Sequence, residues 1–261
     1  IAFDMDGTLL NSNKQISPET LNAIKRATDA GKTVILCTGR NLAELNAFTE
    51  IRPGLRYLDC VSGACVYDLK EKKTLYSQAL DPGIVKKLME FGMEEGAMIH
   101  VLSERSIVQK DQQSHMADFH MGIYQTMFDQ ITDKLENIYN SFFEEPFPVL
   151  KLNLYHRVKR IKAAGLETAL ALAESTSLEC SDKGIDKGVG LKKLCEHLGL
   201  PLEQTIAVGD ADNDTMALKT AGLAVAMGNA TEPIKALADV IVADCDHNGC
   251  AEAIDKYLLA D

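Results

Sequence analysis

Carboxylates follow two short apolar runs of this chain, at the points where strands are expected to end. Asp4 and Asp6 come directly after residues 1–3, and Asp210 and Asp214 follow a second such run. Side chains two positions apart in an extended segment point the same way, so Asp4 and Asp6 are expected to share a face if the extended backbone continues to Asp6. In open α/β sheets, ligands bind beyond the carboxyl ends of the strands. Carboxylates crowded at one such edge repel one another, and a divalent cation would relieve that repulsion.

Phosphoryl transfer is the chemistry that this set of residues suits. The candidate ligands are oxygen atoms, with no histidine or cysteine close by in sequence, which favours Mg²⁺ over zinc. Magnesium usually takes one or two carboxylates together with substrate phosphate. We expect Asp4 to be the nucleophile that forms an aspartyl-phosphate, and Asp6 to be the general acid and base. For each of them, the alternative is a turn or capping residue after a strand.

Groups suited to binding the phosphate lie at the expected ends of strands and at the expected start of a helix. Thr38 and Gly39 follow the apolar run 33–37, Lys187 lies at the start of an expected helix, and Asn213 lies between two acids. Hydroxyl, amide and ammonium donors stabilise the charge that develops on phosphoryl oxygens. Considered alone, Thr38 would be interpreted as a helix N-cap and Lys187 as a solvated helix residue.

The two later acids have different expected roles. Asp210 follows Gly209 at the end of an apolar strand, which favours metal ligation over a loop position. Asp214 either binds the ion directly or orients Lys187 and the bound waters.

The elements around these residues predict a parallel sheet. Residues 17–19, Ser-Pro-Glu, are a helix-start signal with Ser17 as N-cap, and residues 33–37 are a second apolar strand. A right-handed crossover makes the first two strands parallel, so that their polar ends share an edge. The same alternation returns late in the chain, in a helix from Lys187, strands near 205–208, 223–226 and 240–242, and a helix at 251–259. This alternation predicts an α/β fold with one doubly wound parallel sheet, a Rossmann-like core that is split in sequence.

The middle of the chain has a different character. A hairpin is expected over 60–78. Beyond it we expect short strands at 98–102, 106–109, 149–155 and 177–180, and helices at 132–139 and 157–174. Apolar and polar residues alternate over 150–155, which predicts a sheet with one solvent-exposed face. We therefore predict an inserted α+β cap domain, residues 82–181, within a catalytic α/β core domain made of residues 1–81 and 182–261.

Composition and charge narrow the classes of function. The chain of 261 residues has a net charge of −11, with 46% hydrophobic and 25% charged residues. This composition is globular, and no apolar run is long enough to cross a bilayer, so we expect a soluble, cytoplasmic protein without a membrane partner. The acidic balance and the lack of clustered Lys and Arg argue against nucleic acid as a partner. The first strand begins at residue 1, and we expect further residues upstream of it.

Cysteine and histidine spacings argue against other metal sites. The seven cysteines are odd in number and never form Cys-x-x-Cys, so we expect reduced core thiols. His115 and His120 are five residues apart, which does not align them on one helical face.

Four motifs of the chain, in this order, resemble those of the haloacid dehalogenase superfamily of phosphatases. They are Asp4-Met5-Asp6-Gly7-Thr8, Thr38-Gly39-Arg40, Lys187-Gly188 and Gly209-Asp210-x-x-Asn213-Asp214. Residues 226–230, Ala-Met-Gly-Asn-Ala, and an insert between the second and third motifs are similar to its Cof-like branch. Many relatives carry Asn-Gly-Ala where this chain has Ser62-Gly63-Ala64.

This resemblance implies a Mg²⁺-dependent phosphatase with an α+β cap, in which Asp4 is the nucleophile and Asp6 the acid and base. It implies a metal held by Asp4, the Met5 or Asp6 region and Asp210. It further implies a phosphate held by the backbone of Met5 and by Thr38, Gly39, Lys187 and Asn213.

The leading hypothesis is hydrolysis of a small phosphomonoester, a sugar phosphate or a phosphorylated cofactor, under a cap whose closure excludes water. The alternatives are a sugar phosphomutase that uses the same aspartyl-phosphate chemistry, and a non-catalytic metabolite-binding module. Specificity is expected to come from the cap. Its candidate substrate contacts are Arg105, Lys110, His115, His120 and Lys151, and for each a solvated surface position is the favoured interpretation.

Overall fold

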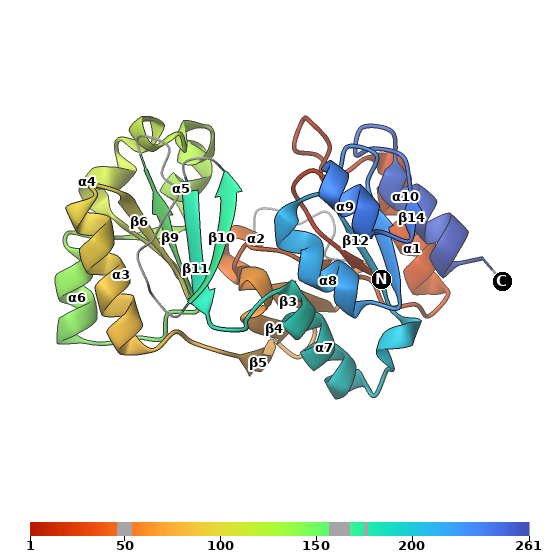
Figure 1. Ribbon diagram of the computed structural model, residues 1–261, viewed down its shortest axis with the longest axis horizontal. Helices are drawn as coiled ribbons and strands as arrows, with labels where there is room; N and C mark the ends of the chain where they lie inside the picture. The colour runs from red at the N-terminus through yellow and green to blue at the C-terminus, as the bar shows by residue number, and fades with distance from the viewer. Residues whose placement is uncertain (46–53, 157–167, 175–176, 261) are drawn as a thin grey trace. The chain divides into compact units, whose positions relative to one another are not determined.

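The computed structural model of the protein describes residues 1–45, 54–156, 168–174 and 177–260, and it divides into two compact units (Figure 1). The first unit consists of Ile1–Gly39, Phe48–Ser77 and Asp186–Asp261. The second consists of Arg40–Ala47 and Gln78–Ile185. The second unit thus contains the predicted insertion, and it also contains the short segment from Arg40, which the sequence analysis assigned to the core.

The first unit is built on a sheet that has eight strands among the described residues. Their spatial order is β14 (Val240–Ile241), β13 (Leu223–Ala226), β12 (Ile206–Gly209), β1 (Ala2–Phe3), β2 (Ile35–Cys37), β3 (Tyr57–Cys60), β4 (Cys65–Asp68) and β5 (Lys73–Ser77). The strands from β14 to β3 are parallel, and Ala2 pairs with Ala207 on one side and Ile35 on the other. This sheet confirms the predicted α/β core, and it brings the carboxyl ends of β1, β2 and β12 to one edge. The antiparallel pair β4–β5 forms the expected hairpin.

Helices pack against this sheet through their apolar faces. They are α1 (Pro18–Asp29), α7 (Lys187–Leu198), α8 (Thr215–Thr220), α9 (Glu232–Leu237) and α10 (Gly249–Ala253), followed by a π-helical turn at Ile254–Leu258. Helix α1 begins as predicted, because the side chain of Ser17 accepts a hydrogen bond from the Thr20 amide at 3.1 Å. Leu191 and Leu194 of α7 pack with Ala217 of α8 over the strands, whereas α1 and α10 contact each other and lie away from α8 in Figure 1. Within the described ranges, no helix combines the length and the apolar character that crossing a membrane requires.

The second unit has its own sheet, with six strands in the part of the chain that the structure describes. Their order is β10 (Thr168–Glu174), β11 (Ser177–Asp182), β9 (Lys151–Tyr155), β6 (Met98–Leu102), β7 (Ser106–Gln109) and β8 (Thr132–Leu135). All neighbours are antiparallel except β7 and β8. Its helices are α2 (Leu42–Leu45), α3 (Pro82–Glu94), α4 (Lys110–Gln113), α5 (Gln125–Ile131) and α6 (Ile138–Glu144).

Parts of two helices expected in this unit are strands in the described residues. The predicted helix at 132–139 is wrong, because residues 132–135 form β8, and α6 begins only at Ile138. The predicted helix at 157–174 is wrong at its end, where residues 168–174 form β10, and residues 157–167 lie outside the described residues. Each segment pairs with a neighbouring strand, β7 or β11, and this pairing outweighs its local helical pattern.

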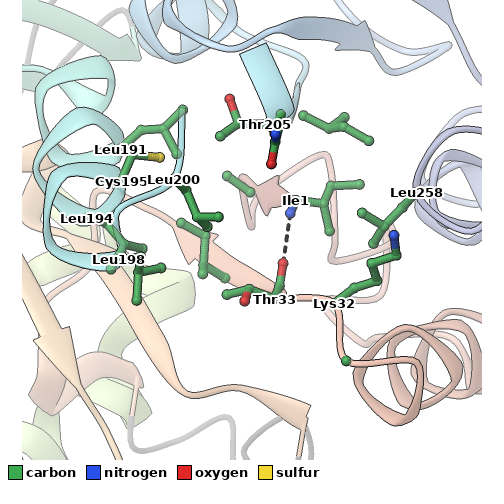
Figure 2. Close-up of a pocket in the computed structure, with 15 residues that line it drawn as sticks. Ile1, Lys32, Thr33, Leu191, Leu194, Cys195, Leu198, Leu200, Thr205 and Leu258 are labelled. Atoms are coloured by element: carbon green, nitrogen blue, oxygen red, sulfur yellow. Dashed lines mark hydrogen bonds between the residues drawn. The ribbon is translucent and has the colours of Figure 1, made fainter. Parts of the chain in front are cut away.

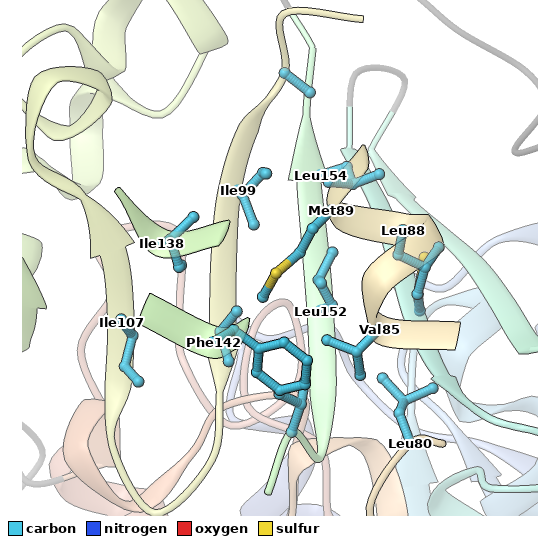
Figure 3. Packing of buried hydrophobic residues seen from close by; sticks show 14 of the residues in the cluster. Leu80, Val85, Leu88, Met89, Ile99, Ile107, Ile138, Phe142, Leu152 and Leu154 are labelled. Atoms are coloured by element: carbon cyan, nitrogen blue, oxygen red, sulfur yellow. The ribbon is translucent and has the colours of Figure 1, made fainter. Parts of the chain in front are cut away.

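One face of the second sheet forms an apolar core with α3 and α6. Figure 3 shows Val85, Leu88 and Met89 of α3 packing with Leu152 and with Phe142 of α6. The burial of this face places the next residues of the same strands, at alternate positions, on the other face.

The other face is also buried, so the predicted solvent-exposed face is wrong. Lys151, Asn153 and Tyr155 of β9 are all buried, with Lys151 paired to Glu179 at 2.6 Å. His100 of β6 contacts the Oγ atom of Ser106 at 2.6 Å and lies against Phe128 of α5. An alternating strand shows only that its two faces differ in chemistry; here the polar face is covered by α5 and its neighbours in the same unit.

Replacing Leu152 by alanine is expected to destabilise the second unit by about 2–5 kcal/mol, because the lost side chain leaves a cavity in its core. Replacing Ile123, which is 80% exposed, is the control and is expected to change stability by less than about 0.5 kcal/mol. Urea unfolding measures both variants. Equal losses of stability would contradict the packing of this core.

Candidate functional site

Lys187 and three acids from separate elements meet at the carboxyl edge of the first sheet. Asp4 follows β1, Asp210 and Asp214 follow β12, and Lys187 is the first residue of α7. The Lys187 Nζ atom contacts Asp4 Oδ1 at 2.5 Å and Asp214 Oδ1 at 2.6 Å. Carboxylate oxygens of Asp4, Asp210 and Asp214 all lie within 4.8 Å of one another.

Burial strengthens the electrostatic interactions among these four side chains. Lys187 is 1% exposed and Asp4 is 7% exposed, so charges here are little screened by water. Burial alone would lower the pKa of Lys187, but Asp214 and Asp4 outweigh it and hold that pKa well above its usual range. Burial raises the pKa of Asp4 to about 7 against the opposing effect of Lys187, and it raises the pKa of Asp210 to about 6. One ammonium group therefore does not balance the three carboxylates of this group.

Asp214 binds backbone amides in addition to Lys187. Its Oδ2 atom accepts hydrogen bonds from the backbone amides of Asp210 at 2.9 Å and Ala211 at 3.1 Å. Its other oxygen is bound to Lys187. Asp214 thus contacts Lys187 and belongs to the acidic group, and the choice between its two predicted roles stays a prediction.

Two residues without an individual role in the sequence analysis hold the loop after β1. The Thr8 hydroxyl donates to Asp210 Oδ1 at 2.7 Å, and the Asn229 side chain donates to the Gly7 carbonyl at 2.8 Å. Gly7 has a φ of +84°, and a Cβ atom there would lie 2.5 Å from Asp210 Oδ2. Both residues fall in motifs that were recognised, but nothing in the sequence indicated which atoms they would contact.

Asp6 is not part of the group of three acids. Its carboxylate binds the Nζ atom of Lys14 at 2.8 Å, and its side chain is 38% exposed. The predicted alignment of Asp4 and Asp6 requires an extended backbone, but β1 ends at Phe3. The turn that follows sends the Asp6 side chain to a different partner. Its predicted roles as acid, base and metal ligand stay predictions.

The remaining predicted phosphate-binding residues surround the same strand ends. Met5 is buried, and its carbonyl accepts from the Leu10 amide at 2.8 Å. Thr38 and Gly39 directly follow β2, and Thr38 is buried. Asn213 lies in a short 3-10 turn, and its buried Oδ1 atom has no hydrogen-bond partner among the described residues.

A strained turn connects Thr38 with the start of α7. Val61, Ser62 and Gly63 all have positive φ values, of 55°, 56° and 92°, and the Ser62 amide donates to the Thr38 carbonyl at 3.0 Å. Asparagine tolerates this conformation better than most residues, so Asn at position 62 would relieve part of the strain at Ser62. A Cβ atom on Gly63 would lie 1.8 Å from the Asp186 carbonyl oxygen. The turn is therefore in close contact with the residue before Lys187.

A pocket of about 430 Å³ lies at the opposite end of the strands (Figure 2). It is lined by Ile1, Thr33 and Thr205, which precede β1, β2 and β12, and by Leu191 and Leu194 of α7 among others. None of its lining residues belongs to the acidic group, so this pocket is separate from the candidate site.

The candidate substrate contacts predicted in the second unit are placed as follows. Arg105 pairs with Asp133, Lys110 with Glu136, and Lys151 with Glu179. His115 contacts Ser114 and the Asp111 carbonyl, and His120 ends a short 3-10 turn. All seven cysteines are free thiols, as expected.

Gly63→Ala and Gly31→Ala form a matched pair, because both glycines have positive φ values. A Cβ atom at position 31 would meet nothing within 4 Å, so alanine there is expected to cost about 1–2 kcal/mol from backbone strain alone. Alanine at position 63 is expected to cost more, because the turn must also move away from Asp186. Thermal unfolding of the two variants measures the difference, and an equal loss of stability would show that the contact with Asp186 is unimportant.

Comparison with known proteins assigns the family. The sequence profile of the haloacid dehalogenase-like hydrolases matches residues 1–254. The phosphatase YwpJ of Bacillus subtilis is 29% identical, over 99% of this chain and 99% of its own length. An HMP-PP phosphatase of Serratia proteamaculans is 30% identical, over 98% of this chain and 94% of its own length. The solved structure of the sugar phosphatase BT4131, of HAD subclass IIB, has the same fold, with a TM-score of 0.83, 23% identity, and coverage of 99% of this chain and 98% of that one.

The family match and the phosphatase relatives together support the resemblance that the four motifs indicated. The chain therefore belongs to the haloacid dehalogenase-like hydrolases.

Proposed function

We propose that this chain is a Mg²⁺-dependent phosphatase that hydrolyses small phosphomonoesters through an aspartyl-phosphate formed on Asp4. The observation that carries the proposal is the meeting of Asp4, Asp210 and Asp214 around the ammonium group of Lys187. These residues come from distant parts of the chain, and crowding their charges in a buried place costs stability, which is typical of functional sites.

The donor set fits a magnesium ion. Asp4, Asp210 and Asp214 offer oxygen atoms only, and the single ammonium group of Lys187 does not balance three carboxylates. Asp4 and Asp210 would hold the ion, with Asp214 as a further ligand or as the residue that orients Lys187. When bound, Mg²⁺ supplies positive charge that stabilises the phosphoryl oxygens.

The chain's own residues divide the chemistry among them. The carboxylate of Asp4 attacks the phosphorus atom, while Lys187 favours the ionised form of that carboxylate and orients it. Asp6 protonates the leaving oxygen and later takes a proton from the attacking water. Its salt bridge to Lys14 is largely exposed and therefore weak, so Asp6 can leave that partner when substrate binds.

Phosphate binding is assigned to groups at the ends of β1, β2 and β12. The Thr38 hydroxyl, the backbone amides of Met5 and Gly39, and the side chains of Lys187 and Asn213 are the proposed donors. The buried Oδ1 atom of Asn213, which has no partner among the described residues, is an acceptor and would take a donor such as a water, so the phosphate contact is assigned to the side-chain NH₂ group.

Small phosphorylated metabolites are the proposed substrates. The names of similar proteins refer to HMP-PP and to a sugar phosphate, and the relatives cover nearly the whole chain. We propose that the second unit serves as the cap that selects among such substrates and that the enzyme acts in the cytoplasm.

Replacing Asp4 by asparagine is expected to lower the release of phosphate from an aryl phosphate by about three orders of magnitude or more, because the amide cannot act as the nucleophile. Asp29→Asn is the control, since Asp29 lies on the surface of α1 and pairs with Lys25. Undiminished turnover in Asp4→Asn would end the assignment.

Incubation with a hexose phosphate separates the mutase alternative, which would yield an isomer instead of free phosphate.

Adding Mg²⁺ is expected to raise the unfolding temperature, because it binds the folded acidic group and not the unfolded chain. At about 100 times its dissociation constant, a ligand adds about 2.7 kcal/mol of stability. Asp210→Asn is expected to remove most of this gain, whereas Asp255→Asn, which changes an exposed acid paired with Arg26, is expected to keep it. An identical Mg²⁺ response in both variants would exclude Asp210 as a ligand.

A further inference from the structure

Asp59 is an acid in the interior of the first sheet. It lies in β3, between β2 and β4, and it is fully buried. Its neighbours in the strand, Leu58 and Cys60, are buried as well. Burial of a carboxyl group without compensation is strongly unfavourable, so this residue requires a physical explanation.

The contacts of Asp59 lead to Lys187. The Cys37 thiol donates to Asp59 Oδ2 at 2.9 Å, and the same sulfur atom lies 3.8 Å from the Lys187 carbonyl oxygen. The pairing of β2 with β3 places Cys37 directly beside Asp59. The other oxygen of Asp59 is buried and has no hydrogen-bond partner among the described residues.

The first turn of α7 is shaped around this carboxyl group. A Cβ atom on Gly190 would lie 1.9 Å from Asp59 Oδ1, and one on Gly188 would lie 2.5 Å from the Met216 carbonyl oxygen. Glycine within a helix is unfavourable, so two in the first turn indicate a packing requirement. The start of α7 is thus held between Asp59 on the sheet and Met216 on α8.

The charge of Asp59 matters because Lys187 is close. The ionisable groups that face it are Cys37 from β2, Lys187 from α7 and Asp186 before that helix. Burial raises the pKa of Asp59 to about 8, although Cys37 and Lys187 oppose this. At neutral pH the carboxyl group is therefore protonated and does not compete with Asp4 and Asp214 for the Lys187 ammonium group.

We propose that Asp59 is a positioning residue, which packs as a neutral carboxyl group against Cys37 and the first turn of α7 and so holds Lys187 between Asp4 and Asp214. This inference rests on the proposed phosphatase function, in which Lys187 orients the nucleophile. As pH rises, ionised Asp59 places a further negative charge near Lys187 and weakens its hold on Asp4. Turnover is therefore expected to fall on the alkaline side as Asp59 loses its proton.

Two variants separate the shape of Asp59 from its charge. Asp59→Asn keeps the shape and is permanently neutral, whereas Asp59→Ala removes the group that supports α7. We measure kcat and KM for an aryl phosphate with Mg²⁺ from pH 6 to about 9.5. The wild type is expected to lose kcat above about pH 8, whereas Asp59→Asn is expected to keep kcat within about twofold of wild type at pH 7 and to lack that alkaline loss. Asp59→Ala is expected to lower kcat about tenfold or more at pH 7 through misplacement of Lys187.

Several outcomes overturn the proposal. An unchanged alkaline loss in Asp59→Asn excludes a role for the charge of Asp59, and wild-type kcat in Asp59→Ala excludes positioning. Should Asp59→Ala fail to fold, the comparison of Asp59→Asn with wild type decides alone.

Binding of inorganic phosphate with Mg²⁺, followed by calorimetry at pH 7 and pH 9, provides a test without turnover. Relative to Asp59→Asn, the wild type is expected to bind more weakly at pH 9 but equally at pH 7, and equal binding at both pH values overturns the proposal. Full turnover in Asp4→Asn would refute the proposed nucleophile and leave this comparison intact. A wild type that binds no phosphate would overturn both.

Discussion

The burial of the Lys187 ammonium group between two carboxylates is the constraint on which the site depends. A buried charge is tolerated only when opposite charges and hydrogen bonds compensate for its lost hydration. Asp4 and Asp214 provide that compensation, and Asp214 in turn binds the backbone of Asp210. Asp4 follows β1, Asp214 comes after β12, and Lys187 begins α7. The two carboxylates therefore compensate the charge of Lys187 only when these three elements have packed together.

Close approaches of backbone hold this assembly together. Gly7 lies against Asp210, Gly63 against Asp186, and Gly190 against Asp59. In each case a side chain on the glycine would occupy the space of its neighbour. The packing of the site therefore depends on glycines, which have no side chain at these positions. The contact of Gly190 with Asp59 also explains why α7 has glycine in its first turn.

The second unit shows how polar residues become buried when they are paired with one another. Its sheet has an apolar face under α3 and α6 and a polar face on which Lys151 pairs with Glu179. His100, Ser106 and Tyr155 satisfy one another on that same face. Burial of hydrogen-bonded side chains on one face and apolar side chains on the other gives this unit a well-defined register, because a shift by one residue would exchange the two faces.

The sequence by itself determined the α/β core, the helix that begins after Ser17, and the residue types that meet around Lys187. It did so because apolar runs, capping residues and polar strand ends are local signals. Tertiary structure decided that residues 132–135 and 168–174 are strands, and that the face of β9 with Lys151 is buried. It also decided that Asp6 pairs with Lys14, and that Asp59 lies beneath α7. Strand pairing, burial and the direction of a side chain after a turn depend on distant partners, which no local pattern contains.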